Sequence, residues 1–391
     1  MRQTSRILLV LMVLLAAGPA LGGVAVANAP GQASAQLGDE VSCEFPVELE
    51  DADGETVVVE EEPERVVALQ PNAAQHMWSI GAQEKVVGMP VNQFTAYLNG
   101  SENRTNVLND EGFSDPETVV DLEPDLVLAP DIVPDETVET LRDANVTVYR
   151  YPLINSFEQM YATVEDVGLL VGEFEGAAET TASVAGTIQA TEAAVEDEES
   201  PRVYYEFFQF TASPGTIDHE VITRAGGENI VQEGDFDRAY GQLSDELLVE
   251  RDPEWLVLQE GAPIPDSEAL QQTTAVQEDQ IIRIDSNFIS QHGPRTLEPL
   301  RTIAEALHPE AIESATVGQA EPVERSRCAI ADGGQTDDGQ TGDGESDDQT
   351  DTTDGETGDT ATDDDADGVG FTAVGAVAAL AVLGLLARRL Q

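Results

Sequence analysis

One arrangement of polar and apolar positions occurs twice along the chain. The first copy runs from Phe113 to Leu128 and the second from Leu243 to Leu258. Each copy has a Ser-Asp helix start, then a Pro-acid turn, then a short apolar run that is typical of a buried strand. Glu117 and Glu246 each stand seven residues before the proline of their copy. We therefore expect them to occupy equivalent places, either as a paired docking feature or as acids favoured at helix starts by the dipole.

Two such units predict two similar lobes, each a small α/β sandwich. Alternation around Asp53-Gly54 predicts a hairpin from Phe45 to Glu60. Further strands are predicted at Arg65–Leu69, Val86–Gly88, Val146–Tyr149, Arg202–Glu206, Ile230–Val231 and Ile281–Ile284. Further helices are predicted at Gln75–Ile80, Val138–Ala144, from Ser156 to about Val195, from a cap at Asp218 to Ala225, and at Pro294–Leu307.

Charge limits the possible partners. The 391 residues carry a formal charge of -58, with Lys85 the single lysine among 18 basic residues. Such an excess of acid excludes nucleic acid as a natural partner. It resembles the acidic, lysine-poor surface of haloarchaeal proteins, because multi-molar salt shortens the Debye length to about 3 Å and makes the self-repulsion tolerable.

The two ends of the chain read as targeting segments. Residues 1–35 have the basic start, apolar core and small-residue cleavage site (Ala33-Ser34-Ala35) of a signal peptide, with earlier cleavage after Gly22 or Ala27 also open. Residues 331–367 are almost wholly polar, with fifteen acids and no base, and predict a disordered spacer. The apolar segment in 368–391 predicts a C-terminal membrane anchor or sorting signal.

Export has two further consequences. Cys43 and Cys328 would face an oxidising exterior, and we predict that they form a disulfide. Asn99, Asn103 and Asn145 head Asn-x-Ser/Thr sequons and are candidate glycosylation sites, although such sequons also arise by chance.

Several ordered segments resemble one family of binding proteins. ERVVAL, IGA and KVVG occur near the start, DLEPDLVLAP and ERDPEWLVL in the middle, and GPRTLEPLRTIAEALHPE at the end. Together they resemble the periplasmic binding proteins for vitamin B12 and ferric siderophores, from about Phe45 to Glu310. The resemblance is specific to the family and not to its ligand.

The resemblance implies an α/β fold in which two α/β lobes are joined by a single long helix, with the ligand cleft between them. It places the N-terminal lobe at residues 40–172, the linking helix at 173–197 and the C-terminal lobe at 198–328. The implied function is that of an extracellular substrate-binding protein, a monomer tethered to the membrane, which hands a metal chelate to an ABC permease with its ATPase. In that family one surface glutamate per lobe pairs with permease arginines, and Glu117 and Glu246 match this motif.

Aromatic and charged side chains fall where cleft loops are expected, beyond the carboxyl ends of the strands. As a set they would line an interlobe pocket for a large planar ligand, although the run from Tyr204 to Phe210 also fits a buried strand with alternate residues in the core. The predicted ligand-binding residues are His76, Trp78, Phe94, Tyr97, Tyr205, Phe208, Arg238, Tyr240, His292 and Arg295.

Aromatics and amides favour a corrinoid such as cobalamin over a ferric siderophore, because anionic chelates usually call for several positive groups. Haem and a free metal ion remain open, since His76, His219 and His292 could approach the cleft and a metal site needs about four convergent ligands. No cofactor is expected beyond a bound cobalt or iron chelate.

Two rival classes remain. A surface protein such as an adhesin is opposed by the α/β alternation and the twin glutamate units. A secreted hydrolase is opposed by the lack of a nucleophile elbow or of a His-x-x-x-His pair, so no catalytic residues are assigned.

Overall fold

The computed structural model describes residues 43–314. The predicted signal peptide, Cys328, the acidic spacer and the C-terminal anchor lie outside these residues. Within 43–314, no helix combines the length and the apolar character that a membrane crossing requires.

The first sheet has five parallel strands in the order β5-β4-β3-β6-β7. Its central strands are wholly buried, which explains their continuous apolar sequences. The strands are β3 (Val66–Ala68), β4 (Val86–Met89), β5 (Thr105–Asn106), β6 (Leu126–Pro130) and β7 (Val148–Tyr151). The helices between them are α1 (Pro71–Ser79), α2 (Pro116–Asp121) and α3 (Asp135–Asp143), with short 3-10 turns η1 (Gln83–Lys85) and η2 (Ser101–Asn103).

The predicted hairpin precedes this sheet as β1 (Val47–Glu50) paired antiparallel with β2 (Thr56–Val59). Ion pairs fasten its turn to β7. Buried Arg150 lies 2.9 Å from Asp53, and the amide of Ala52 donates to the carbonyl of Arg150. Arg142 adds ion pairs to Asp51 and Asp53. The hairpin is therefore fixed to the sheet by charge as well as by its apolar face.

The second sheet is also parallel, in the order β10-β8-β12-β13. Its strands are β8 (Arg202–Glu206), β10 (Glu228–Asn229), β12 (Trp255–Gln259) and β13 (Ile281–Ile284), and a separate pair joins β9 (Thr211–Ala212) to β11 (Tyr240–Gly241). The helices are α6 (Ile217–Arg224), α7 (Asp245–Arg251), α8 (Glu268–Gln271), α9 (Thr274–Gln277), α10 (Ser286–Ser290), η3 (Pro294–Thr296), α11 (Leu297–Leu307) and α12 (Pro309–Ser314).

Two local predictions in this half were wrong, and one alternative does not hold. The cap of α6 is Thr216, whose hydroxyl accepts from the amide of His219, so Asp218 lies in the first turn. The strand expected at Ile230–Val231 lies two residues earlier, at β10. The aromatic run does not continue as a strand, because β8 ends at Glu206 and Phe207 pairs with Phe210 across a tight turn.

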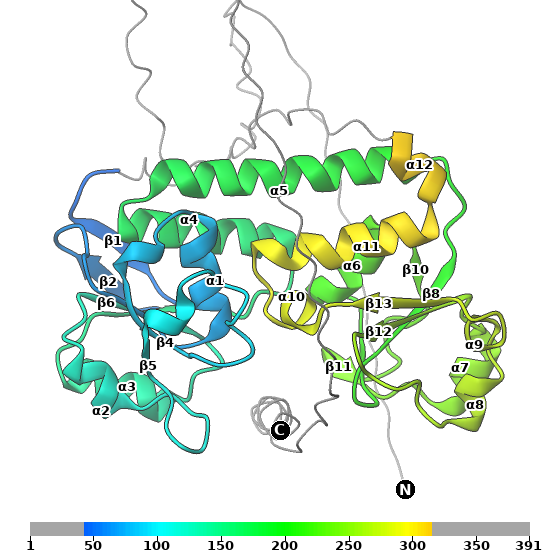
Figure 1. Cartoon of the computed structure of the whole chain (residues 1–391), viewed down its shortest axis with the longest axis horizontal. Helices are drawn as coiled ribbons and strands as arrows, with labels where there is room; N and C mark the ends of the chain where they lie inside the picture. The colour runs from blue at the N-terminus through cyan, green and yellow to red at the C-terminus, as the bar shows by residue number, and fades with distance from the viewer. Residues whose placement is uncertain (1–42, 315–391) are drawn as a thin grey trace, which may run out of the picture. The chain divides into compact units, whose positions relative to one another are not determined.

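The helical region from Ser156 forms two helices, α4 (Phe157–Val171) and the 22-residue α5 (Phe174–Val195). Gly172 separates them in a left-handed conformation that glycine adopts readily. Helix α5 packs against α1 of the first lobe and against α6, α11 and α12 of the second, and so touches both lobes (Figure 1). A Cβ at Gly176 would stand 2.0 Å from the carbonyl oxygen of Ile80, so the contact with α1 requires glycine. The domain boundaries themselves remain a prediction.

Each repeated unit makes the same bonds to an arginine at the start of a neighbouring strand. Arg65, which directly precedes β3, donates to the carbonyls of Leu122 and Glu123 at the end of α2. Arg202 donates in the same way to Arg251 and Asp252 at the end of α7. The acid after each proline then accepts from the backbone amide of that arginine, through Asp125 in one unit and Glu254 in the other.

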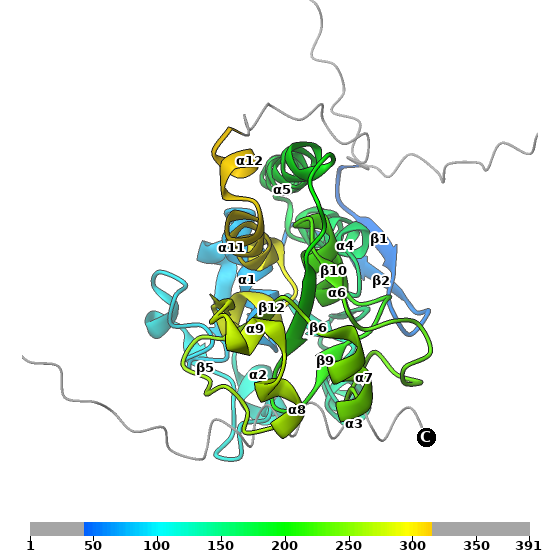
Figure 2. The same cartoon turned by 90° about the vertical axis from the view of Figure 1, so that its right-hand side faces the viewer.

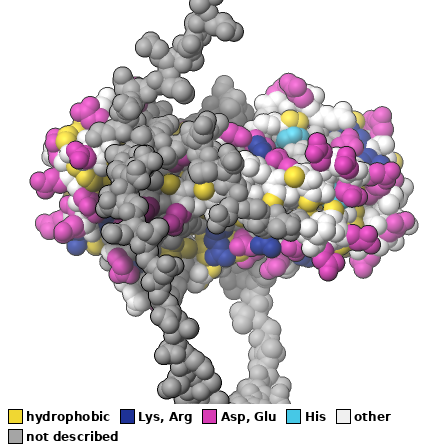
Figure 3. Space-filling view, turned by 90° about the horizontal axis from the view of Figure 1, so that it is seen from above, with side chains coloured by type: hydrophobic (Ala, Val, Ile, Leu, Met, Phe, Trp, Pro, Cys, Tyr) yellow, Lys and Arg dark blue, Asp and Glu magenta, His cyan; other side chains and the backbone are white. Residues whose placement is uncertain are grey.

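The repeat therefore predicts three-dimensional equivalence correctly. Asp115 caps α2 and Ser244 caps α7. Helices α2 and α7 both lie on the side of the described residues away from α5 in two perpendicular views (Figures 1 and 2). On the face that carries α5, acidic side chains are spread among apolar ones and do not form one patch (Figure 3).

Candidate functional site

The elements that follow the carboxyl ends of both sheets carry most of the predicted ligand-binding residues. Helix α1 follows β3, the segment 91–99 follows β4, the turn Phe207–Phe210 follows β8, and α10 with the segment 291–295 follows β13. Ligands of α/β folds bind at this end of the strands.

A chain of hydrogen bonds joins the elements of the first sheet to those of the second. The side-chain amide of Gln75 donates to the hydroxyl of Tyr97 (2.9 Å), and that hydroxyl donates to Gln291 Oε1 (2.7 Å). Gln291 Nε2 donates in turn to the carbonyl of Phe94 (2.7 Å). Gln75 and Gln291 are both buried, so these bonds are shielded from water. We call Gln75, Tyr97 and Gln291 the amide bridge.

Arg295 lies over aromatic rings beside the amide bridge. Its guanidinium carbon is 4.1 Å from the ring centroid of Phe288 and 5.0 Å from that of Tyr97. Its backbone amide donates to Gln75 Oε1 (2.9 Å). Burial raises the pKa of Tyr97 to about 12 despite the hydrogen bond from Gln75 and the nearby Arg295 charge, so the hydroxyl stays protonated. The arrangement offers a neutral hydrogen-bonding surface with one positive group.

A second cluster lies after β8. Tyr205 stacks on Phe207 with centroids 5.0 Å apart, and Phe207 meets Tyr240 edge to face at 5.7 Å. Burial, followed by the charge and hydrogen bond of Asp218, raises the pKa of Tyr240 well above its usual value. Tyr205, Phe207 and Tyr240 thus form one aromatic cluster at the carboxyl end of β8.

Asp218 connects this cluster to the segment 291–295. Its carboxylate is buried, and its Oδ1 lies 3.5 Å from His292 Nε2 without a hydrogen-bond partner in the described part of the chain. His292 has a positive φ of 43°, a conformation that non-glycine residues seldom adopt outside functional sites or tight turns. The strained backbone holds the imidazole against Asp218.

Four predicted ligand-binding residues lie apart from these contacts: Trp78, Phe208, Arg238 and the core residue His76. Trp78 donates from its indole to the carbonyl of Asn99 (3.0 Å) and lies under Arg104. Phe208 is 52% exposed at the tip of its turn. Arg238 is exposed on the loop before β11, and its carbonyl accepts from the hydroxyl of Ser213.

The histidines do not converge. His76 is buried, its ring meets Tyr151 edge to face at 5.9 Å, and neither ring nitrogen has a partner among residues 43–314. His219 Nδ1 lies 3.1 Å from the amide of Asn229, and burial lowers the pKa of His219. His308 is buried against the carbonyl of Gly226. Within residues 43–314, no three His, Cys, Asp or Glu side chains gather as they would around a metal ion.

Replacing His76 with phenylalanine should flatten the pH dependence of stability. Burial lowers the pKa of His76 from 6.5 to about 4, so between these values the unfolded chain binds more protons than the folded chain. The contribution of neutral His76 to the free energy of unfolding is therefore fully present above pH 6.5. It is lost as the pH drops toward 4, by about 3 kcal/mol in total. Urea unfolding at about pH 7.5 and about pH 4.5 measures this loss. An equal loss in His76→Phe and in the wild type would contradict it.

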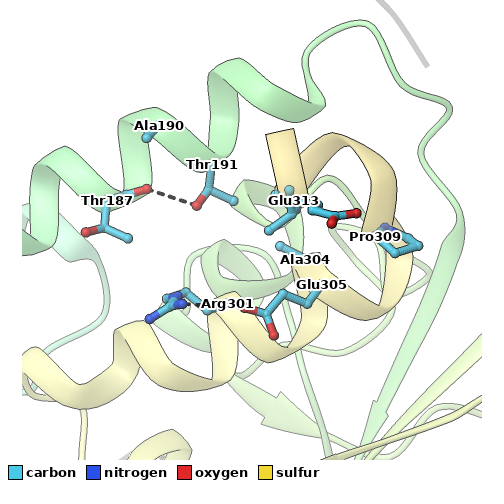
Figure 4. Close-up of a pocket in the computed structure, with 9 residues that line it drawn as sticks. Thr187, Ala190, Thr191, Arg301, Ala304, Glu305, Pro309 and Glu313 are labelled. Carbon is cyan, nitrogen blue, oxygen red and sulfur yellow. Dashed lines mark hydrogen bonds and ion pairs between the residues drawn. The ribbon is translucent and has the colours of Figure 1, made fainter. Parts of the chain in front are cut away.

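A cavity of about 350 Å³ lies elsewhere, between α5, α11 and α12 (Figure 4). Its walls include Thr187, Thr191 and the Arg301–Glu305 ion pair. It contains no aromatic residue and none of the predicted ligand-binding residues. The aromatic groups at the strand ends therefore suit a large planar ligand better than this cavity does.

The remaining predicted residues are placed as follows. Glu117 and Glu246 are exposed in the first turns of α2 and α7. Cys43 packs against the core of the first sheet. The asparagines of the three sequons, Asn99, Asn103 and Asn145, are all exposed.

Sequence reasoning missed Gln75, Gln291, Phe288 and Asp218. Gln75 and Gln291 each directly precede a histidine that was selected, and Phe288 lies in the helix that follows the last strand. Their positions after strands were the available signal. Asp218 was noticed only as a helix cap.

Comparison with known proteins agrees with this architecture. Residues 66–288 match the family described as Periplasmic binding protein. The Cobalamin-binding protein of Halobacterium salinarum is 35% identical over 310 residues, which are 76% of this chain and 84% of that protein. The periplasmic vitamin B12 binding protein of Vibrio cholerae has a TM-score of 0.53 at 22% identity, over 63% of this chain and 97% of that one. The apo periplasmic heme-binding protein of Roseiflexus sp. RS-1 has a TM-score of 0.56 at 22% identity, over 63% and 99%.

Two α/β lobes, each built on a parallel sheet and with aromatic and amide side chains at the carboxyl ends of its strands, are the architecture of a two-lobed solute-binding protein. The chain belongs to the periplasmic binding protein family.

Proposed function

We propose that this protein is the extracellular substrate-binding protein of an ABC importer, and that it binds a cobalamin-type corrinoid between its lobes. The observation that carries the proposal is the amide bridge with Arg295, which joins the two sheets where ligands of α/β folds bind. The 35% identity to a protein named for cobalamin binding supports the same ligand.

The chemistry of the site favours a corrinoid over an anionic chelate. A corrinoid presents a broad macrocycle rimmed by amide groups, which aromatic faces and neutral hydrogen-bonding groups can match. The site offers the half-buried Tyr97 for such contacts, and the buried Gln75 and Gln291 hold its hydroxyl in place. Its positive groups are Arg295 and, when protonated, His292, which faces the buried Asp218 carboxylate. An anionic ferric chelate, or haem with its two propionates, finds little positive charge here.

We further propose that the protein is exported and held at the outer face of the membrane by its C-terminal segment, as a monomer. Cys43 and Cys328 pair in this form, and the three exposed sequons are available for glycosylation. The charge of -58 suits a medium of concentrated salt. The protein carries its ligand to the permease and its ATPase without a catalytic step.

Titration with cobalamin at multi-molar salt tests the proposal. Saturable one-to-one quenching of tryptophan fluorescence is expected, and it should come mainly from Trp78, whose indole donates to the carbonyl of Asn99 in the segment that also carries Tyr97. Trp255 lies at the amino end of β12, away from the ligand edge of the sheet. Trp255→Phe should therefore keep the quenching, and Trp78→Phe should lose most of it.

A ferric hydroxamate and haem serve as competing ligands in the same titration, with correction for their own absorbance. Saturation by either one, without a response to cobalamin, would replace the corrinoid as the ligand. A folded protein that responds to none of the three would contradict the proposed function.

A further inference from the structure

Few large apolar side chains are exposed, and two of them lie within four residues of the twin glutamates in the sequence. In residues 43–314 the exposed large hydrophobic side chains are Val58, Phe113, Phe208 and Val249. Phe208 lies at the tip of the turn after β8, and Val58 lies in the hairpin. Phe113 comes four residues before Glu117, and Val249 comes three residues after Glu246.

Phe113 is 44% exposed in a loop with ordered hydrogen bonds. Its backbone amide donates to the Asn109 side-chain oxygen (3.0 Å), and its carbonyl accepts from the backbone amide of Asn109 (2.8 Å). The next residue, Ser114, is buried and donates from its hydroxyl to the carbonyl of Leu69. An aromatic ring that stays exposed on a fixed backbone loses little entropy when a partner covers it.

Val249 is 49% exposed on α7. Residues three apart on a helix share a face, so Val249 and Glu246 form one surface. Leu248 turns instead into the core, so the helix is anchored while Val249 faces outward. In both repeats, an exposed glutamate in the first helical turn therefore has an exposed apolar neighbour.

Charge alone would not direct a partner to these two places. The chain has 76 acidic residues, exposed acids occur along the whole described chain, and they are also spread over the face that carries α5 (Figure 3). In concentrated salt, ion pairs between exposed groups are screened and weak, whereas apolar burial is not screened. An apolar side chain beside each glutamate supplies what distinguishes these sites from the rest of the acidic surface.

We propose that Phe113 and Val249 are the apolar anchors of the permease-docking surface, each paired with its glutamate. The inference rests on the proposed function and adds the chemistry of the partner. The permease must offer, at each of two places, an apolar socket beside an arginine. Helices α2 and α7 lie on the same side of the described residues, so one membrane protein can contact both (Figures 1 and 2).

The test measures docking of the full-length protein to the permease–ATPase complex that supports cobalamin uptake with the wild type. Phe113→Ser with Val249→Ser is compared with Val58→Ser, which removes an exposed apolar side chain from the hairpin. Binding to the complex in nanodiscs is measured at about 1 M and about 3 M KCl. The double variant should dock at least about tenfold more weakly at both salts, and Val58→Ser should match the wild type.

Cobalamin affinity of each variant confirms that its fold and cleft are intact. Docking of the double variant equal to that of Val58→Ser, while the wild type docks, would overturn the anchors and leave the proposed function standing. Failure of the wild type to bind cobalamin or to dock would overturn both. A loss that appears only at the lower salt would assign docking to charge and contradict the inference.

Discussion

Replacing both Glu117 and Glu246 with alanine is expected to abolish cobalamin uptake and to leave cobalamin affinity unchanged. Both carboxylates are exposed on equivalent helices, far in sequence from the amide bridge. Exposed ion pairs contribute only about 0.2–1 kcal/mol, but truncating one partner of a charge pair that docking buries costs about 2–5 kcal/mol. Losing two such pairs would weaken docking by roughly a thousandfold or more. Uptake of labelled cobalamin and titration of the purified variant measure the two quantities.

The chain offers a control of identical charge. Glu111 and Glu250 are exposed acids near the same two helices, and their double replacement with alanine removes the same net charge. Uptake should persist in this control. If both double variants lost uptake equally, the effect would come from general surface charge. Loss of cobalamin binding in Glu117→Ala with Glu246→Ala would make these glutamates ligand contacts.

The fold was largely predictable because it depends on local periodicity. The apolar runs at β6 and β12 mark buried parallel strands, and the repeated spacing between Glu117 or Glu246 and the following proline fixed the equivalence of the two units. The bonds from Arg65 and Arg202 to the ends of α2 and α7 explain why that spacing recurs. In each unit the helix end, the residue with positive φ that follows it (Glu123 or Asp252) and the next strand must all be spaced to fit the same arginine side chain.

The site was less predictable because its contacts are not local. Gln75 and Gln291 meet across 216 positions of sequence, which no periodicity reveals. His76 illustrates a second limit. Successive residues on a helix point about 100° apart, so Gln75 reaches the bridge whereas His76 next to it enters the core. Asp218 illustrates a third limit. An aspartate at a helix start suggests a cap from the sequence, and only the folded chain brings this one to His292.

Gln291→Leu is expected to disrupt the cleft. Leucine has a similar size but cannot accept from Tyr97 or donate to the carbonyl of Phe94, so buried polar groups on the first sheet's side lose their partner. Each unsatisfied group costs about 1–3 kcal/mol. We expect the free energy of unfolding to fall by about 2–4 kcal/mol and cobalamin to bind at least about tenfold more weakly, because the two sides of the site are no longer held in one geometry.

Gln259→Leu is the matched control, since the bonds of this buried amide, to Ser290 Oγ (3.3 Å) and to the Tyr205 hydroxyl, both lie within the second lobe. It should lower stability by about 1 kcal/mol and change cobalamin affinity far less than Gln291→Leu does.

A double-mutant cycle of Gln291→Leu with Gln75→Leu measures the coupling energy of the two amides directly. Residues in one network couple by about 0.5–3 kcal/mol, so the double variant should lose less stability than the two single losses combined. Strict additivity, or equal affinities for Gln291→Leu and Gln259→Leu, would mean that the amide bridge stabilises the fold without shaping the ligand site.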